Sequence, residues 1–245
     1  MNLWQIKATE EMTAFLQNYL NIEKIDLIGS MTDRSLLDEF SDVDMEIHLN
    51  DCASLDIRKL LNAMSEQQFE IFGYEKYYFD DKSVLRVCFE NGWRFDLTFL
   101  YPKQRECFVE EETQIAKIES TINQFWFISV LVLVKLGRKD NLIAAHLALE
   151  LCQLIIVLQM HLRDTAKSTD FHKSGENEDV PILHALTQTS EVSSKNIEDE
   201  IIEILYHSAE HMETVSAPFA RGVKQTDKLR EIHNKLFSSE NNCRY

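Results

Sequence analysis

The chain has 245 residues, of which 44% are hydrophobic, so it can bury one large core or two modest ones, which excludes a disulfide miniprotein and a disordered tail. Its 25 lysines and arginines against 41 aspartates and glutamates give a formal charge of −16, which disfavours a nucleic-acid binder and favours cations, whether metal ions or polyamine-like molecules. The six glycines form neither a Walker loop nor a G-x-G-x-x-G dinucleotide motif.

The first hundred residues change their hydrophobic period repeatedly. In chain order this predicts a helix, two strands, a second helix and a β-hairpin, over residues 10–20, 24–28, 42–49, 55–72, and 84–90 with 93–100. Gly29 stops the first strand, and Asn91-Gly92 is the dipeptide that best tolerates the positive φ angles of a tight hairpin.

Residues 42–49 alternate strictly between apolar and polar side chains. This pattern predicts a strand with one apolar face and one polar face. The apolar face carries Val43, Met45, Ile47 and Leu49, and the polar face carries Asp42, Asp44, Glu46 and His48. The polar face is therefore available for chemistry.

Beyond residue 110 the sequence is almost entirely helical in its spacing. A long apolar helix is expected to end at Gly137 in a left-handed stop, and a second helix to begin at Asp140 as N-cap and to end near Arg163. Asn196 can cap a third helix, and Pro218 suits the first turn of a fourth.

We therefore expect an α+β protein with two domains. A small mixed sheet with helices occupies residues 1–105, and an all-helical bundle occupies residues 106–245. The longest uncharged apolar run, residues 125–134, is about half of the roughly 20 residues a membrane-spanning helix needs, so no membrane segment and no signal peptide are expected. Five cysteines without a C-x-x-C pair are typical of reduced thiols in the cytoplasm.

The pattern that carries chemistry is Gly29-Ser30 followed by Asp42 and Asp44. Two carboxylates at i and i+2 on a strand point the same way, with backbones about 7 Å apart. Like charges held so closely either raise the pKa of one carboxyl strongly or bind a cation. A site built from carboxylates favours Mg²⁺ with substrate phosphates as further ligands. Asp96 on the hairpin is expected opposite the apolar Val87, where sharing the metal would offset the cost of its burial.

The glycine and serine suit a triphosphate, because Gly29 lets the backbone approach a phosphate and Ser30 adds a hydroxyl beside exposed N–H groups. The matching reaction is attack by an acceptor hydroxyl on the α-phosphorus of a nucleoside triphosphate, with pyrophosphate leaving. The helical domain of residues 106–245 is expected to bind the acceptor. Asp96 is the expected proton acceptor. Glu46 is the alternative, although it is more simply a salt-bridge partner of Arg86 or Arg94.

These motifs resemble known proteins at two levels. Gly29-Ser30, Asp42-x-Asp44 and the later strand aspartate resemble the nucleotidyltransferase superfamily of DNA polymerase beta. Two further segments resemble the bacterial aminoglycoside 6-adenylyltransferases, which modify streptomycin. They are the strand that begins Arg94-Phe-Asp-Leu-Thr-Phe and the helix that begins Asn123-Gln-Phe-Trp-Phe-Ile-Ser and runs through residues 134–138 to 147. The resemblance covers roughly residues 5 to 230.

The resemblance implies residue roles. It gives the metal and acid–base roles to Asp42, Asp44 and Asp96, and it places Lys135 and Arg138 toward the triphosphate. The family usually has arginine directly after Gly-Ser, where this chain has Met31, and Arg34 lies close enough in sequence to substitute.

The resemblance also implies an activity, which is transfer of AMP from Mg-ATP to a hydroxyl of an aminoglycoside antibiotic. Two alternatives stay open: the same chemistry on a lincosamide or another small hydroxylated acceptor, and a toxin–antitoxin type of nucleotidyltransferase directed at a protein partner.

The segment His207-Ser-Ala-Glu210-His211 fits the H-x-x-E-H pattern of one class of zinc peptidases. We reject that reading, because its third ligand would have to come from the thirty-odd residues that follow.

Overall fold

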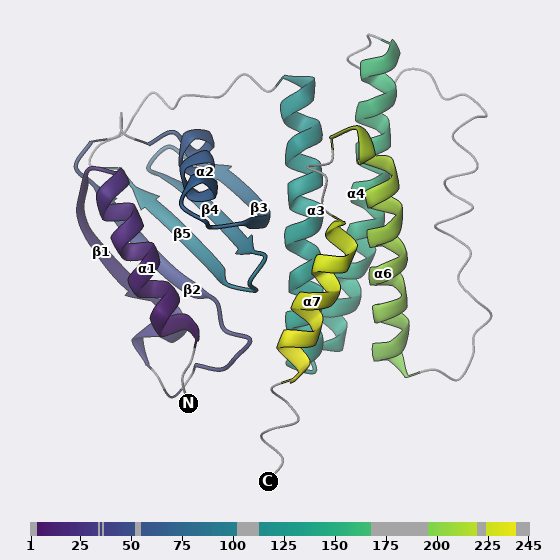
Figure 1. The fold of residues 1–245 in the computed structure, drawn as a ribbon, viewed down its shortest axis with the longest axis horizontal. Coiled ribbons are helices and arrows are strands. Elements are labelled where there is room, and N and C mark those ends of the chain that lie inside the picture. The colour runs from purple at the N-terminus through teal and green to yellow at the C-terminus, as the bar shows by residue number, and fades with distance from the viewer. Residues whose placement is uncertain are drawn as a thin grey trace. The chain divides into compact units, whose positions relative to one another are not determined.

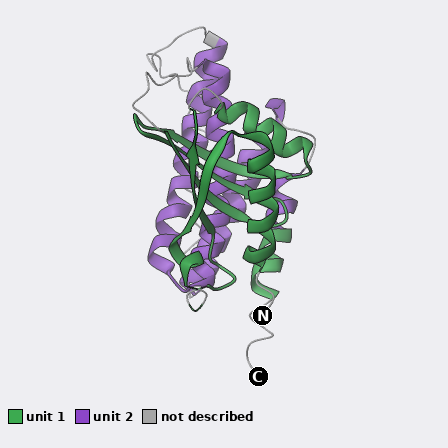
Figure 2. Cartoon of the chain, turned by 90° about the vertical axis from the view of Figure 1, so that its left-hand side faces the viewer, with its two compact units in different colours: residues 1–110, 231–245 green, residues 111–230 purple. Residues whose placement is uncertain are grey.

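The structure, a computed structural model, describes residues 4–33, 35, 37–51, 55–101, 113–167, 196–219 and 224–238. The chain divides into two compact units, residues 1–110 with 231–245 and residues 111–230 (Figure 2). The predicted boundary between residues 105 and 106 lies outside the described residues.

The first unit holds a five-stranded mixed sheet (Figure 1). The strands lie in the order β1-β2-β5-β4-β3, and β2 and β5 are the parallel pair. The elements in chain order are α1 (Trp4–Tyr19), β1 (Ile22–Ile28), the 3-10 turn η1 (Gly29–Thr32), β2 (Val43–Leu49), α2 (Ile57–Glu66), β3 (Ile71–Tyr78), β4 (Lys82–Phe89) and β5 (Arg94–Leu100).

One face of this sheet is covered by α1 and α2. The inward side chains of β2 and β5 are almost completely buried and pack against Met12 and Leu16 of α1 and Leu60 and Met64 of α2. The predicted alternation in β2 is confirmed, because its odd-numbered residues are buried and its even-numbered residues are partly exposed. The even-numbered side chains therefore lie on the face away from the core, where the acidic residues gather.

Two predictions within this unit are wrong. The helix expected over residues 55–72 ends at Glu66, and residues 71–78 form β3, which pairs with β4. Its three tyrosines and one phenylalanine suit an edge strand. The hairpin loop is also one residue longer than expected, because the amide of Phe89, rather than that of Glu90, donates to the carbonyl of Trp93.

The longer loop follows from the turn chemistry. Glu90, Asn91 and Gly92 form a three-residue loop in which Gly92 has φ +90. A three-residue loop needs a left-handed residue at its end, which glycine supplies. The register therefore places Asp96 opposite Arg86 rather than Val87, and this shift changes the electrostatics of the site.

The second unit is helical. Its elements are α3 (Gln114–Gly137), α4 (Asn141–Lys167), α6 (Ile197–Val215), the 3-10 turn η4 (Ala217–Phe219) and the start of α7 (Gln225–Ser238), whose last residues belong to the first unit. The predicted α+β class, a mixed-sheet unit followed by a helical region, is confirmed.

The junction between α3 and α4 differs from the prediction in one detail. Gly137 is the last helical residue, and the left-handed position is Lys139, with φ +60. The amide of Lys139 donates to the carbonyl of Leu136 and that of Asp140 to the carbonyl of Lys135, which is a Schellman motif. Asp140 then caps α4 as expected, accepting from the amide of Ile143. Further on, Pro218 lies in η4 rather than in the first turn of α7.

Two helices are long and apolar enough by composition to cross a membrane: α3, and α4 over residues 141–166. Core helices of soluble proteins pass the same test, and 61% of the most apolar window of α3 is buried inside the structure, against 33% for α4. The expectation of no membrane segment stays a prediction.

Candidate functional site

The three aspartates singled out by the sequence lie together on the polar face of the sheet. Asp44 on β2 and Asp96 on β5 are direct neighbours in the parallel ladder, and Asp42 lies one residue before β2. Carboxylate oxygens of all three lie within 4.8 Å of one another. A parallel pair in register puts its side chains on the same face, which is why Asp44 and Asp96 converge.

The loop that leads to Asp42 is held by buried side chains that sequence analysis did not identify. The amide group of Gln5 donates to the carbonyls of Asp38 (2.7 Å) and Ser41 (3.0 Å). The guanidinium of Arg94 donates to the same Ser41 carbonyl at 3.3 Å. Gln5 and Arg94 are 0% and 2% exposed. Because these bonds go to backbone atoms across the fold, they fix the point at which the chain enters β2, and no local sequence motif signals them.

Gly29 packs directly against the cluster. Its φ is +60, and a Cβ built on it would lie 2.3 Å from Oδ2 of Asp44. Glycine is thus required for both its backbone angle and its closeness to a carboxylate. Ser30 follows it in η1 and is partly buried, and the hydroxyl of Thr32 donates to the Gly29 carbonyl at 2.8 Å. Arg34, the expected substitute for the family arginine, lies outside the described residues.

Asp96 has a basic partner in Arg86. The Nε–H of Arg86 donates to both carboxylate oxygens of Asp96, at 3.1 and 3.0 Å. The Nη1 of the same guanidinium lies 3.3 Å from Oε2 of Glu75 on β3. The side chains of Arg86 and Asp96 are 28% and 27% exposed, and that of Glu75 is 8% exposed. The sequence predicted neither partner, because the hairpin register was off by one residue and β3 was not recognised.

The electrostatics of the cluster favour a cation. Burial, followed by the charges of Asp42 and Asp96, raises the pKa of Asp44 to about 6. Burial also raises the pKa of Asp96 against the opposing charge of Arg86. A divalent cation would relieve this repulsion, and oxygen donors suit Mg²⁺. The residues present therefore fit a magnesium ion.

A second acidic group lies further along the same face. Glu46 gathers there with Asp26 and His48, with ligand atoms again within 4.8 Å of one another. Asp26 is already engaged, by Lys24 at 2.7 Å and by Nε2 of His48 at 3.0 Å. Glu46 thus lies in this neighbouring group rather than with the three aspartates, which favours Asp96 over Glu46 as a proton acceptor.

The remaining candidate residues lie in the helical unit. Lys135 is in the last turn of α3, and Arg138 is its C-cap residue. Their role toward a triphosphate stays a prediction. Of the H-x-x-E-H residues, Glu210 pairs with Arg230 at 2.9 Å and His211 contacts the amide of Gln159 at 3.4 Å. Neither they nor His207 belongs to a potential metal-binding group in the part of the chain that the structure describes.

Two solved structures are similar to the chain. One is an aminoglycoside 6-adenyltransferase from Bacillus subtilis, with 13% sequence identity and a TM-score of 0.33 over 94% of this chain and 97% of that chain. The other is a STING-associated CdnE c-di-GMP synthase from Capnocytophaga granulosa, with 13% identity and a TM-score of 0.30 over 97% of this chain and 80% of that chain. No protein-family model and no curated protein matches the sequence.

Proposed function

We propose that the chain is a nucleotidyltransferase that transfers AMP from Mg-ATP to a hydroxyl of an aminoglycoside. One observation carries the chemistry: carboxylates from two adjacent parallel strands and the residue before one of them converge within 4.8 Å, beside a glycine turn. Such a cluster would hold a divalent cation next to a backbone bend that can receive phosphates.

Each part of the site has a proposed task. Asp42, Asp44 and Asp96 would hold magnesium, which stabilises the charge that develops on the transferred phosphoryl group and on pyrophosphate. The turn at Gly29 and Ser30 would receive the triphosphate. Asp96 would accept the proton of the attacking hydroxyl, because it lies within the cluster whereas Glu46 lies in the group beside it.

An aminoglycoside as acceptor has two supports. The first is the resemblance of the strand at Arg94 and the helix at Asn123 to the adenylyltransferase family. The second is the formal charge of −16, which attracts a polycationic acceptor. We propose a cytoplasmic enzyme, in line with the dispersed cysteines, of which Cys88 and Cys152 are free thiols.

The test is pyrophosphate release from ATP with a panel of aminoglycosides and lincosamides. We expect release only with an aminoglycoside. The Asp44→Asn variant should lower the rate of pyrophosphate release by about 100-fold, because each 1.4 kcal/mol of lost charge stabilisation costs about a factor of ten. The control is Asp26→Asn, which removes a carboxylate from the same sheet face outside the cluster. Release stimulated only by lincosamides would mean that the acceptor is a lincosamide and not an aminoglycoside. Full activity of Asp44→Asn would refute the proposed metal site.

A further inference from the structure

Asp42 is anchored differently from the other two aspartates of the cluster. Asp44 and Asp96 face each other in the ladder of β2 and β5, so the sheet itself fixes their backbones. Asp42 lies one residue before β2 and outside this ladder. The direction of its carboxylate therefore depends on the loop of residues 38–41 that leads to it.

Polar groups from α1 and β5 hold the backbone of this loop. Like the carbonyl of Ser41, that of Glu39 accepts from two donors, the indole N–H of Trp4 and the guanidinium of Arg94, each at 3.3 Å. These bonds fix backbone carbonyls and do not fix side chains. The large apolar side chain of the loop, Phe40, is held by a different element.

Phe40 packs against the last helix of the chain, α7. Its side chain is 7% exposed, and its ring centroid lies 6.4 Å from that of Phe237, with the two planes at 63°. The ring of Phe237 also meets that of His233, one turn earlier on α7, at 4.7 Å and 79°. Edge-to-face pairs have a preferred geometry, so this contact orients Phe40 as well as burying it.

We infer that Phe237 is a positioning residue for Asp42. Through the ring of Phe40 it fixes the loop two residues before Asp42, and so it sets where this carboxylate meets the other two. The inference deepens the proposed function and rests on its metal site.

The rest of α7 supports this role. Ile232 and Leu236, one turn apart on the helix, are buried, so the end of α7 is docked by an apolar face and not by one ring alone. The first part of α7 belongs to the second unit, where the hydroxyl of Thr226 donates to Glu213 at 2.9 Å. One continuous helix therefore links the unit expected to bind the acceptor to the loop before Asp42.

The inference is tested by double-mutant cycles on Mn²⁺ binding, measured by electron paramagnetic resonance on the full chain without nucleotide. Phe237→Ala is introduced into the parent chain, the Asp42→Asn chain and the Asp96→Asn chain. We expect it to weaken Mn²⁺ binding by about 10-fold in the parent, as when a residue that orients a ligand is removed. The weakening should be the same with Asp96→Asn. With Asp42→Asn it should fall below about 2-fold, because the ligand that Phe237 positions is then already lost.

A control variant separates positioning from a general loosening of the first unit. Phe15→Ala removes an aromatic ring from α1, where Phe15 packs against Phe69 at 5.5 Å, and it should leave the Mn²⁺ affinity unchanged. Far-UV circular dichroism verifies each fold. Phe237→Leu keeps an apolar contact without the ring and supplies a milder variant, with an expected weakening of about 3-fold for the lost ring pair.

Equal weakening by Phe237→Ala in the parent and in the Asp42→Asn chain, or no weakening in the parent, would overturn the inference. A loss of Mn²⁺ affinity in Phe15→Ala as large as that in Phe237→Ala would also overturn it, because the effect would then not be specific to the loop before Asp42.

The failure of the inference and that of the proposed function are distinguishable. Cycles that follow the expectation without any pyrophosphate release from ATP would refute only the proposed function. Aminoglycoside-stimulated release that Asp44→Asn abolishes, together with an unchanged Mn²⁺ affinity of Phe237→Ala, would refute only the inference. Absence of Mn²⁺ binding in the parent would refute both.

Discussion

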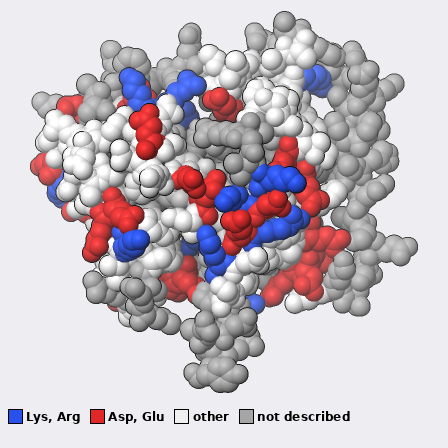
Figure 3. Space-filling view, viewed as in Figure 1, with Lys and Arg blue, Asp and Glu red and all other residues white. Residues whose placement is uncertain are grey.

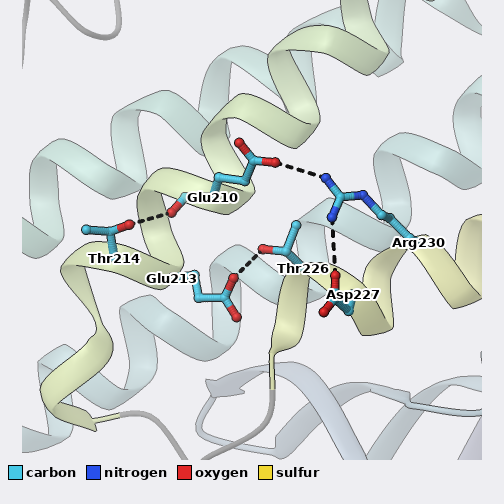
Figure 4. A network of polar contacts seen from close by, with 6 residues as sticks. All are labelled: Glu210, Glu213, Thr214, Thr226, Asp227 and Arg230. Atoms are coloured by element: carbon cyan, nitrogen blue, oxygen red, sulfur yellow. Dashed lines mark hydrogen bonds and ion pairs between the residues drawn. The ribbon is translucent and has the colours of Figure 1, made fainter.

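Two arginines, one in each unit, make ion pairs of nearly the same length in very different surroundings. Arg86 lies 3.0 Å from Asp96 and 3.3 Å from Glu75. Arg230 lies 2.9 Å from Glu210 and 3.3 Å from Asp227 (Figure 4). The side chains of the Arg230 group are 46–60% exposed, whereas Glu75 is 8% exposed. Distance alone therefore does not tell which network constrains the molecule.

The difference comes from the elements that carry the two networks. The Arg86 row is fixed by the hydrogen-bond register of three adjacent strands. The Arg230 contacts join α6 to α7 and one turn of α7 to the next, on a face where acidic and basic side chains lie interleaved (Figure 3). Exposed ion pairs of this kind are screened by water and contribute little to stability. Loss of one partner from a buried pair leaves the other charge poorly solvated, which is costly.

Replacing each arginine should give the largest difference in stability between the two networks. We expect Arg86→Ala to lower the free energy of unfolding by about 3 kcal/mol, near the low end for a broken buried pair because Arg86 and Asp96 keep some contact with water. Arg230→Ala should cost about 1 kcal/mol or less. Urea unfolding followed by far-UV circular dichroism measures both values.

The stability lost on replacing Arg86 also tests the role of Glu75. Adding Glu75→Gln to Arg86→Ala should recover part of the lost stability, because it removes the charge left buried. Equal costs for Arg86→Ala and Arg230→Ala would mean that burial does not separate the two networks.

The backbone beside the cluster gives a second contrast, between two glycines with positive φ. Gly29→Ala and Gly92→Ala should each cost about 1–2 kcal/mol of stability for the left-handed backbone. Only at Gly29 does the added Cβ meet Asp44, at 2.3 Å, whereas at Gly92 it meets nothing within 4 Å. Gly29→Ala should therefore also weaken Mn²⁺ binding by about 10- to 100-fold, as when a ligand is displaced. Comparable Mn²⁺ affinities of the two variants would contradict the close packing at Asp44.

Much of the acidic site was predictable because it depends on local pattern. Strict alternation over β2 fixed which side chains share the polar face, and the spacing to Gly29 and Asp96 indicated a metal cluster. The partner of Asp96 was not predictable in the same way. It depends on whether the hairpin loop has two or three residues, and a shift of one residue exchanges Val87 for Arg86.

Long-range contacts explain the rest of what sequence analysis missed. Gln5 and Arg94 act through backbone carbonyls more than thirty residues away in the chain, and such bonds leave no periodic signal. At the end of α3 a local signal was misleading. Gly137 was expected to take the left-handed conformation, and Lys139 takes it instead. Its hydrogen bonds to the last carbonyls compensate for a residue other than glycine.

Helix caps offer a test with a smaller expected effect. It compares a side chain that makes a capping hydrogen bond with one that makes none. Asp56 caps α2 and accepts from the amide of Lys59 at 3.1 Å, while Asn196 precedes α6 without a side-chain capping bond. Asp56→Ala should cost about 1 kcal/mol, the usual value of a made cap, and Asn196→Ala distinctly less. Urea midpoints of the two variants decide the point, and a larger loss for Asn196→Ala would refute the assignment of the bonds.

The smallest expected effect concerns pH and the helical unit. Burial, helped by the charge of His207, lowers the pKa of His211 below its ordinary value of 6.5. The unfolded chain then takes up the proton more readily than the folded one, so this residue's contribution to stability is present above pH 6.5 and is lost as pH falls through the lowered folded pKa. His211→Gln should reduce the difference in unfolding free energy between pH 8 and about pH 5.5, by less than the cap at Asp56 contributes because the imidazole is only partly buried. An unchanged pH dependence in that variant would mean that groups other than His211 cause the loss of stability at low pH.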